Sequence, residues 1–124
     1  MMELKHDCIR DLLLGLEENL KLNQTLSVSE IADLSSMTSY NHDDIVYTVN
    51  KLSEAGFIKS FSYMGGGLDV SEITYYGHQF LDNVRGNNIW SETKSHLSKV
   101  GGAASLSIIS ELASNIVKAK LGIS

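Results

Sequence analysis

The chain of 124 residues has 43% hydrophobic and 20% charged residues, which is enough for one ordinary hydrophobic core and excludes a wholly disordered protein. Its net charge of −5, single cysteine and lack of proline argue against a general nucleic-acid coat protein, an internal disulfide framework and proline-rich ligand motifs. Charges interrupt the N-terminus and no apolar run approaches the roughly 20 residues that cross a bilayer, so we expect a cytoplasmic protein that does not contact a membrane.

Two helices are predicted before residue 35. Apolar residues recur every three or four positions over residues 4–22, which is the pattern of an amphipathic helix. Cys8 belongs to the apolar stripe of this helix, which predicts a buried structural thiol. Ser27 and Glu30 have the spacing of a capping box, in which each side chain accepts a hydrogen bond from the other residue's amide. We therefore expect a short second helix directly after Ser27.

A third helix and a hairpin are predicted next. The polar residues 35–40 indicate a turn, Asn41 is a favourable helix cap, and Gly56 suits the left-handed position that ends a helix. Residues 57–64 and 68–73 have the composition and loose alternation of strands. The three glycines between these segments predict the tight turn of a β-hairpin.

Three further helices complete the predicted elements. Thr74 is placed to cap a helix over residues 75–84, and a second helix is expected over residues 89–99. The glycine pair at 101–102 predicts a break before a last helix over residues 103–121.

The predicted order of three helices, a hairpin and a further helix is that of a winged helix-turn-helix. The segment NKLSEAGFI at 50–58 resembles the end of a winged-helix recognition helix running into its first wing strand, and ITYYGHQFL at 73–81 resembles the return from the wing. We therefore predict an α+β fold whose winged helix-turn-helix core, three helices plus a β-hairpin wing, covers residues 1–86. Two additional C-terminal helices over residues 87–124 are expected to pack on this core as an extension, in a single compact unit.

Five parts of the chain carry a likeness to a known family: HDCIRDLLL at 6–14, LSEAGFI at 52–58, TYYGHQFLDNVR at 74–85, Trp90 with Lys94, and ASLSIISELAS at 104–114. They resemble an uncharacterised family, found mostly in bacteria and their prophages, that carries only a domain-of-unknown-function label. The resemblance covers nearly the full length. It implies a phage-linked or prophage-linked setting but no known activity, and it provides no functional residues that could be assigned to this chain.

The charge distribution is unfavourable for DNA binding by the predicted core. Residues 1–84 hold five basic and thirteen acidic residues, a balance of −8, whereas residues 85–124 hold five basic and two acidic residues, a balance of +3. Phosphate contacts from cations dominate affinity for duplex DNA. The acidic half of the chain is therefore the half that would have to read DNA.

The predicted recognition helix and wing carry the candidate partner contacts. Asn50 and Lys51 could read base edges, whereas Asp43 and Glu54 would repel phosphates, and residues 60–84 include no lysine or arginine. We therefore expect a regulatory or interaction module that binds a protein partner, with sequence-specific DNA binding by a transcriptional regulator as the alternative. The candidate contacts are Asp43, Tyr47, Asn50, Lys51, Glu54, Lys59 and Tyr63.

No pattern in the sequence predicts catalysis. It lacks the serine-hydrolase, zinc-protease, phosphate-loop and dinucleotide-binding motifs, and its four histidines include no pair at helical ligand spacing. We therefore expect a protein that is not an enzyme and has no cofactor, catalytic or metal-binding residues. A metal site assembled from residues far apart in the sequence stays open.

The last predicted helix has an apolar arc wide enough to need burial on more than one side. Packing within the domain and homodimer formation both satisfy this need, and a dimer would suit a regulator that reads two half-sites. The residues proposed for this packing are Leu106, Ile109, Leu112, Ala113, Ile116 and Val117.

Overall fold

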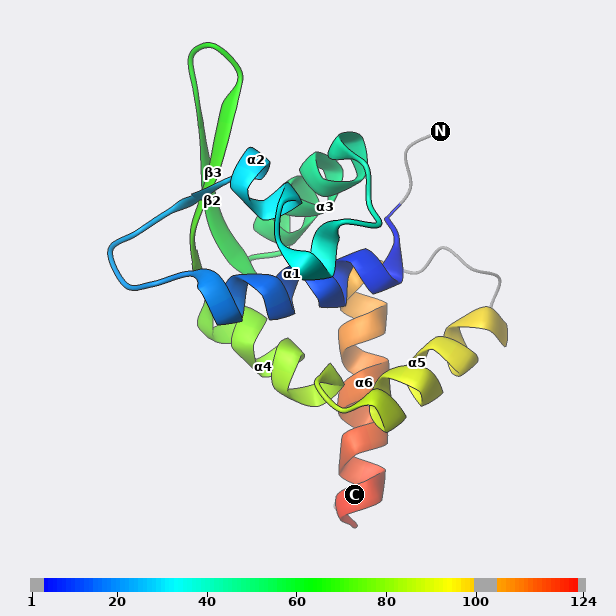
Figure 1. Cartoon of the computed structure of the whole chain (residues 1–124). Coiled ribbons are helices and arrows are strands. Elements are labelled where there is room, and N and C mark those ends of the chain that lie inside the picture. The colour runs from blue at the N-terminus through cyan, green and yellow to red at the C-terminus, as the bar shows by residue number, and fades with distance from the viewer. Residues whose placement is uncertain (1–3, 100–104, 123–124) are drawn as a thin grey trace. The chain divides into compact units, whose positions relative to one another are not determined.

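The computed structural model describes residues 4–99 and 105–122. These residues form six α-helices, a short 3₁₀ helix and a three-stranded antiparallel sheet, so the fold is α+β as predicted (Figure 1). None of the helices described is long and apolar enough to cross a membrane. In chain order the elements are α1 (His6–Asn19), β1 (Leu26–Ser27), α2 (Val28–Ala32), η1 (Ser35–Met37), α3 (His42–Glu54), β2 (Ile58–Tyr63), β3 (Gly67–Ile73), α4 (Tyr75–Val84), α5 (Asn87–Lys99) and α6 (Leu106–Leu121).

The chain divides into two compact units, residues 1–78 and residues 79–124, which we call unit 1 and unit 2. The division falls within α4. The predicted boundary at residue 86 and the predicted packing of the C-terminal helices on the core stay predictions.

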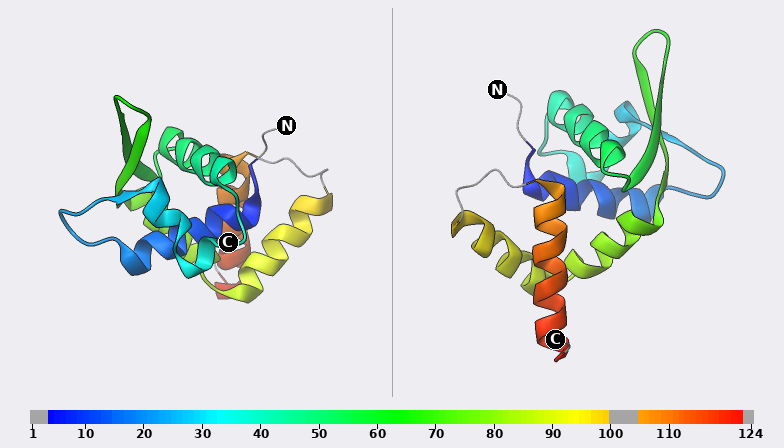
Figure 2. Two further views of the ribbon diagram at one scale, coloured as in Figure 1. Left: turned by 45° about the horizontal axis from the view of Figure 1, so that its top comes forward. Right: turned by 180° about the vertical axis from the view of Figure 1, so that it is seen from behind.

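In unit 1 the helices α1, α2 and α3 pack together beside the sheet (Figures 1 and 2). Each helix buries the apolar stripe that its sequence period predicts, and α3 also packs against β2. Cys8 is fully buried among these residues, as predicted. The fully buried apolar side chains of this unit are Cys8, Ile9, Leu12, Leu13, Leu16, Ile31, Met37, Ile45, Val49, Leu52 and Val70.

The predicted caps form as expected, because capping depends on contacts within one turn. The Ser27 side chain accepts a hydrogen bond from the Glu30 amide at 3.2 Å, and the Glu30 carboxylate accepts one from the Ser27 amide at 3.1 Å. The Asn41 side chain accepts from the Asp44 amide at 2.8 Å and starts α3. Gly56 follows α3 with φ +81°, which places it in the left-handed region.

Three features differ from the sequence-based expectation. The first helix ends at Asn19 rather than residue 22, because Leu20 takes an extended backbone and Asn23 has φ +65°. The predicted turn over residues 35–40 contains the 3₁₀ helix η1, which buries Met37. The two-residue strand β1 was not predicted, since only its pairing with Val70 and Asp69 of β3 defines it.

The sheet has the strand order β1-β3-β2, and β2 and β3 form the predicted hairpin. Gly65 and Gly66 form the turn with φ +96° and +89°, values that favour glycine. Tyr63 pairs with Gly67 across the hairpin, and a Cβ atom at Gly67 would lie 1.9 Å from the Tyr63 ring. Because Gly67 has no side chain, the Tyr63 ring can lie over it.

Unit 2 contains α5 and α6, which pack against each other. The predicted starts at residues 89 and 103 differ from the structure, where α5 begins at Asn87 and α6 begins at Leu106 after the cap Ser105. Lys120 pairs with Glu92 at 3.7 Å across the two helices. The predicted break at residues 101–102 lies outside the described residues.

Candidate interaction surface

The exposed face of α3 holds four of the predicted contact residues together. Ile45, Val49 and Leu52 are buried, so the residues on the other side of the helix point outward. Asp43 is also exposed, in the first turn of the helix. A shallow hollow of about 440 Å³ is lined by Tyr47, Asn50, Lys51, Ser53 and Glu54.

Lys51 is tied to its neighbours on this face. Its ammonium lies 2.9 Å from the Glu54 carboxylate and 5.3 Å from the centre of the Tyr47 ring. The hydrogen bond to Glu54 raises the pKa of Lys51, so this lysine stays charged. Its charge is balanced locally by Glu54, which weakens any attraction to a phosphate.

Lys59, the other predicted basic contact, is also paired. Its ammonium lies 3.0 Å from the Glu72 carboxylate, and the two residues are register partners in β2 and β3. Both lysines among the predicted contacts therefore have carboxylate partners.

The hairpin carries three exposed apolar side chains at and near its turn. Phe61 and Tyr63 are 45% and 49% exposed, and Met64 is 100% exposed. The rings of Phe61 and Tyr63 are 5.8 Å apart in a tilted arrangement, and the Tyr63 hydroxyl donates a hydrogen bond to Asp69. We call Phe61, Tyr63 and Met64 the hairpin tip.

The hairpin and α3 meet at the base of β2 but present different faces. The hydroxyl groups of Ser60 and Ser53 lie 2.9 Å apart, so Ser60 is on the face of the hairpin that contacts α3. Since side chains alternate along a strand, Lys59 and Tyr63 project from the opposite face. Lys59 and Tyr63 therefore do not share a surface with the α3 hollow. The sequence predicts all seven candidate contacts as one group and does not predict this separation.

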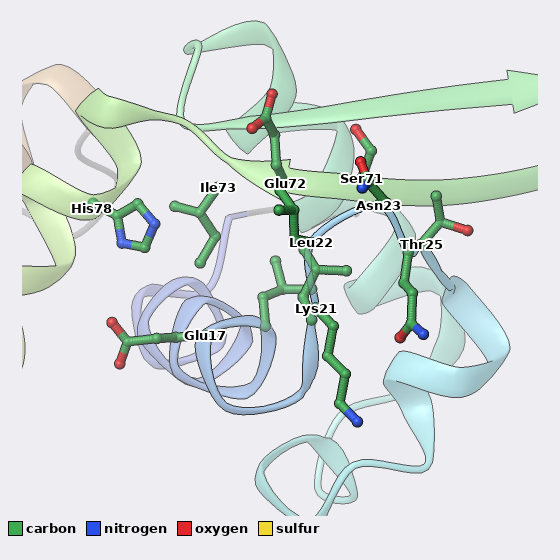
Figure 3. Close-up of a pocket in the computed structure, with 12 residues that line it drawn as sticks. Glu17, Lys21, Leu22, Asn23, Thr25, Ser71, Glu72, Ile73 and His78 are labelled. Atoms are coloured by element: carbon green, nitrogen blue, oxygen red, sulfur yellow. The ribbon is translucent and has the colours of Figure 1, made fainter.

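A larger pocket, of about 550 Å³, lies between the end of α1, the following loop and β3 (Figure 3). Leu16 and Ile73 contribute apolar walls, while Glu17, Glu72 and His78 contribute polar groups. None of the predicted contact residues lines this pocket. Sequence reasoning missed it because it is formed by segments about fifty residues apart, which no local pattern connects.

The described residues contain no group of three or more histidine, cysteine or acidic side chains placed to hold a metal ion. Cys8 is enclosed, its Sγ atom lies 3.3 Å from the Thr48 hydroxyl, and burial raises the pKa of its thiol. A protonated, enclosed thiol is a poor nucleophile. This environment fits the structural role expected for Cys8.

The residues predicted for packing of the last helix fall into two groups. Leu106, Ile109, Ala113 and Ile116 are buried, whereas Leu112 and Val117 are half-buried. The buried group accounts for part of the apolar arc that the sequence predicts to be buried. Whether the chain forms a dimer stays a prediction.

A family model described as a hypothetical protein, DUF2513, matches residues 3–104. The chain belongs to the DUF2513 family. A similar relative is an uncharacterized protein of Haemophilus influenzae, which is 26% identical over 123 residues, with 97% of this chain and 99% of that protein covered. No solved structure matches the chain. Membership of DUF2513 confirms the predicted resemblance to an uncharacterised family, and it brings no assigned activity to the surface described above.

Proposed function

We propose that this chain is a non-catalytic interaction or regulatory module of winged-helix type that binds a protein partner through the hairpin tip and the adjacent strand face. The observation that carries the proposal is the exposure of Phe61, Tyr63 and Met64 on a projecting hairpin. Aromatic and methionine side chains are enriched at the centres of protein interfaces. Exposed apolar side chains that lie together mark interaction sites more often than scattered single ones do.

The arrangement of unit 1 supports the winged-helix part of the proposal. The short strand β1 precedes α2, the helices α2 and α3 follow one another, and the hairpin begins directly after α3. In such a layout α3 corresponds to the recognition helix and the β2–β3 hairpin to the wing.

Site-directed photocrosslinking in cells tests the proposal. A photoreactive phenylalanine analogue is placed at Phe61 or at Met64, and in a matched control at Ser95, an exposed position of α5. We expect the hairpin positions to crosslink to one defined protein and the Ser95 position to crosslink to none. Substituting Tyr63 by serine in the Phe61 probe protein should reduce that crosslink, because the two rings contact each other.

Sequence-specific DNA binding is the second candidate function, and the exposure of Asn50 on α3 favours it. A fluorescence-anisotropy titration with genomic fragments at two salt concentrations separates the two functions. A DNA reader binds at low salt and loses affinity steeply as salt rises. We expect no binding even at low salt, and nucleic acid rather than protein crosslinked to the hairpin would contradict the proposal.

A further inference from the structure

The outer surface of α6 carries a stripe that the described chain leaves uncovered. Ile108 is 51% exposed although the same helix buries Ile109 completely. The residues spaced three and four positions onward from Ile108 lie on one face of the helix, and all of them are exposed or half-buried. This stripe consists of Ile108, Glu111, Leu112, Asn115, Lys118 and Ala119.

A groove borders the stripe within unit 2. It lies between α5 and α6, has a volume of about 470 Å³ and is lined mainly by apolar atoms. Leu97 of α5 and Ile108 and Leu112 of α6 supply much of this apolar lining. An exposed isoleucine next to an apolar groove is a surface that a second helix can cover.

The charges on the stripe fit a second copy of the same helix. Glu111 and Lys118 are seven residues apart, which places them on one face about 10 Å apart along the axis, too far to pair with each other. Within residues 4–99 and 105–122 neither has an ion-pair partner. Lys120, by contrast, already pairs with Glu92 of α5.

We propose that α6 pairs with α6 of a second copy of this chain in an antiparallel arrangement. The two-fold axis would pass between residues 114 and 115, midway between Glu111 and Lys118. Each Glu111 then faces Lys118 of the partner subunit, so one symmetric contact makes two ion pairs, as isologous interfaces do. Asn115 lies beside the axis, where the two copies meet.

The resulting contact would bring the α5–α6 pairs of the two copies together. It uses a face of α6 different from the buried residues Leu106, Ile109, Ala113 and Ile116. It also involves neither the hairpin tip nor α3, so it stands or falls independently of the protein-binding function proposed above.

Charge reversal on the full-length chain tests the pairing by sedimentation equilibrium at low salt. Glu111→Lys and Lys118→Glu each place like charges opposite each other twice, and each should weaken self-association by about tenfold or more. The double variant, Glu111→Lys with Lys118→Glu, should recover the wild-type association constant. An equimolar mixture of the two single variants should form heterodimers, because every pair in the mixed dimer is again attractive.

Ile108→Ser tests the apolar part of the contact, with Leu22→Ser as the matched control because Leu22 is 90% exposed in a loop of unit 1. The first substitution should weaken association and the second should leave it unchanged, while circular dichroism checks that both chains are folded. A wild-type chain that stays monomeric at high micromolar concentration overturns the proposal. So does a Glu111→Lys chain that associates as tightly as the wild type.

Discussion

Gly77 allows the first turn of α4 to lie close to Phe57, which follows α3. A Cβ atom at this position would lie 2.0 Å from the backbone oxygen of Phe57 and 2.8 Å from Ile73. The first turn of α4 is held there by Thr74, whose hydroxyl accepts a hydrogen bond from the Gly77 amide at 3.2 Å and donates one to the Gly56 carbonyl. The start of α4 is therefore fixed against the chain that follows α3.

Gly77→Ala should lower the free energy of unfolding by about 2 kcal/mol or more, because the neighbouring atom is backbone and cannot rotate away. Urea denaturation followed by circular dichroism measures this change. Gly86→Ala is the matched control, because a Cβ atom at Gly86 meets nothing within 4 Å. This substitution should lower the free energy of unfolding by less than about 1 kcal/mol. Equal losses in the two variants would show that the close contact with Phe57 is not the cause.

Tyr40 joins the loop after η1 to α1 through a single side chain. Its hydroxyl donates a hydrogen bond to the Asp11 carboxylate at 2.7 Å. Burial, followed by the bond to Asp11 and the charge of that residue, raises the pKa of Tyr40 well above its ordinary value. The folded protein therefore holds the phenolic proton more tightly than the unfolded chain does.

Tyr40→Phe should lower the free energy of unfolding by about 1 kcal/mol at neutral pH, the usual value of one such hydrogen bond. Because the pKa is raised in the folded state, this contribution is complete below the unfolded-state value and is lost as pH rises through the alkaline range. The difference between wild type and variant should therefore shrink above about pH 10. Urea titrations at pH 7 and at alkaline pH measure it, and a difference that grows with pH would contradict this account.

At the scale of elements, α2 depends on its cap more than longer helices do. It has only five residues, and helices this short have little intrinsic stability. The reciprocal bonds between Ser27 and Glu30 satisfy two amides that the helix itself leaves unpaired. Ser27 also belongs to β1 and pairs with Asp69, so the cap joins the helix to the sheet.

Ser27→Ala should therefore reduce the free energy of unfolding by about 1 kcal/mol. Ser29→Ala, on the exposed side of the same helix, should have almost no effect or be slightly stabilising, since alanine has the higher helix propensity. Chemical denaturation of both variants provides the measurement. If the Ser29 and Ser27 variants lost the same free energy of unfolding, the capping bonds of Ser27 would not be the cause of the loss.

At the scale of the whole molecule, unit 2 is small. It comprises residues 79–124, which hold the second half of α4 together with α5 and α6. A segment of this size buries a small fraction of its apolar surface and is marginally stable on its own in water. The chain's single tryptophan, Trp90, is buried in α5 and reports on this unit. All five tyrosines precede residue 79 and report on unit 1.

We predict that the two units unfold together. Urea transitions followed by Trp90 fluorescence and by tyrosine absorbance should then share one midpoint. Two separate midpoints would show that unit 2 unfolds independently and would contradict the single compact unit expected from the sequence.

Features that depend on a few neighbouring residues could be predicted from the sequence: the caps at Ser27 and Asn41, the left-handed Gly56, and the glycine turn of the hairpin. Each follows from contacts within about one turn of chain, where residue type and backbone geometry are directly coupled. The membership of an uncharacterised family was also readable from the residues.

The contacts between segments far apart in the sequence became known only from the folded chain. β1 exists because it pairs with β3 more than forty residues away, and the pocket in Figure 3 requires the end of α1, β3 and His78 to come together. The carboxylate partner of Lys59 and the separation of Tyr63 from the α3 hollow likewise depend on strand register. Pairing and register are set by long-range contacts, which local composition does not encode.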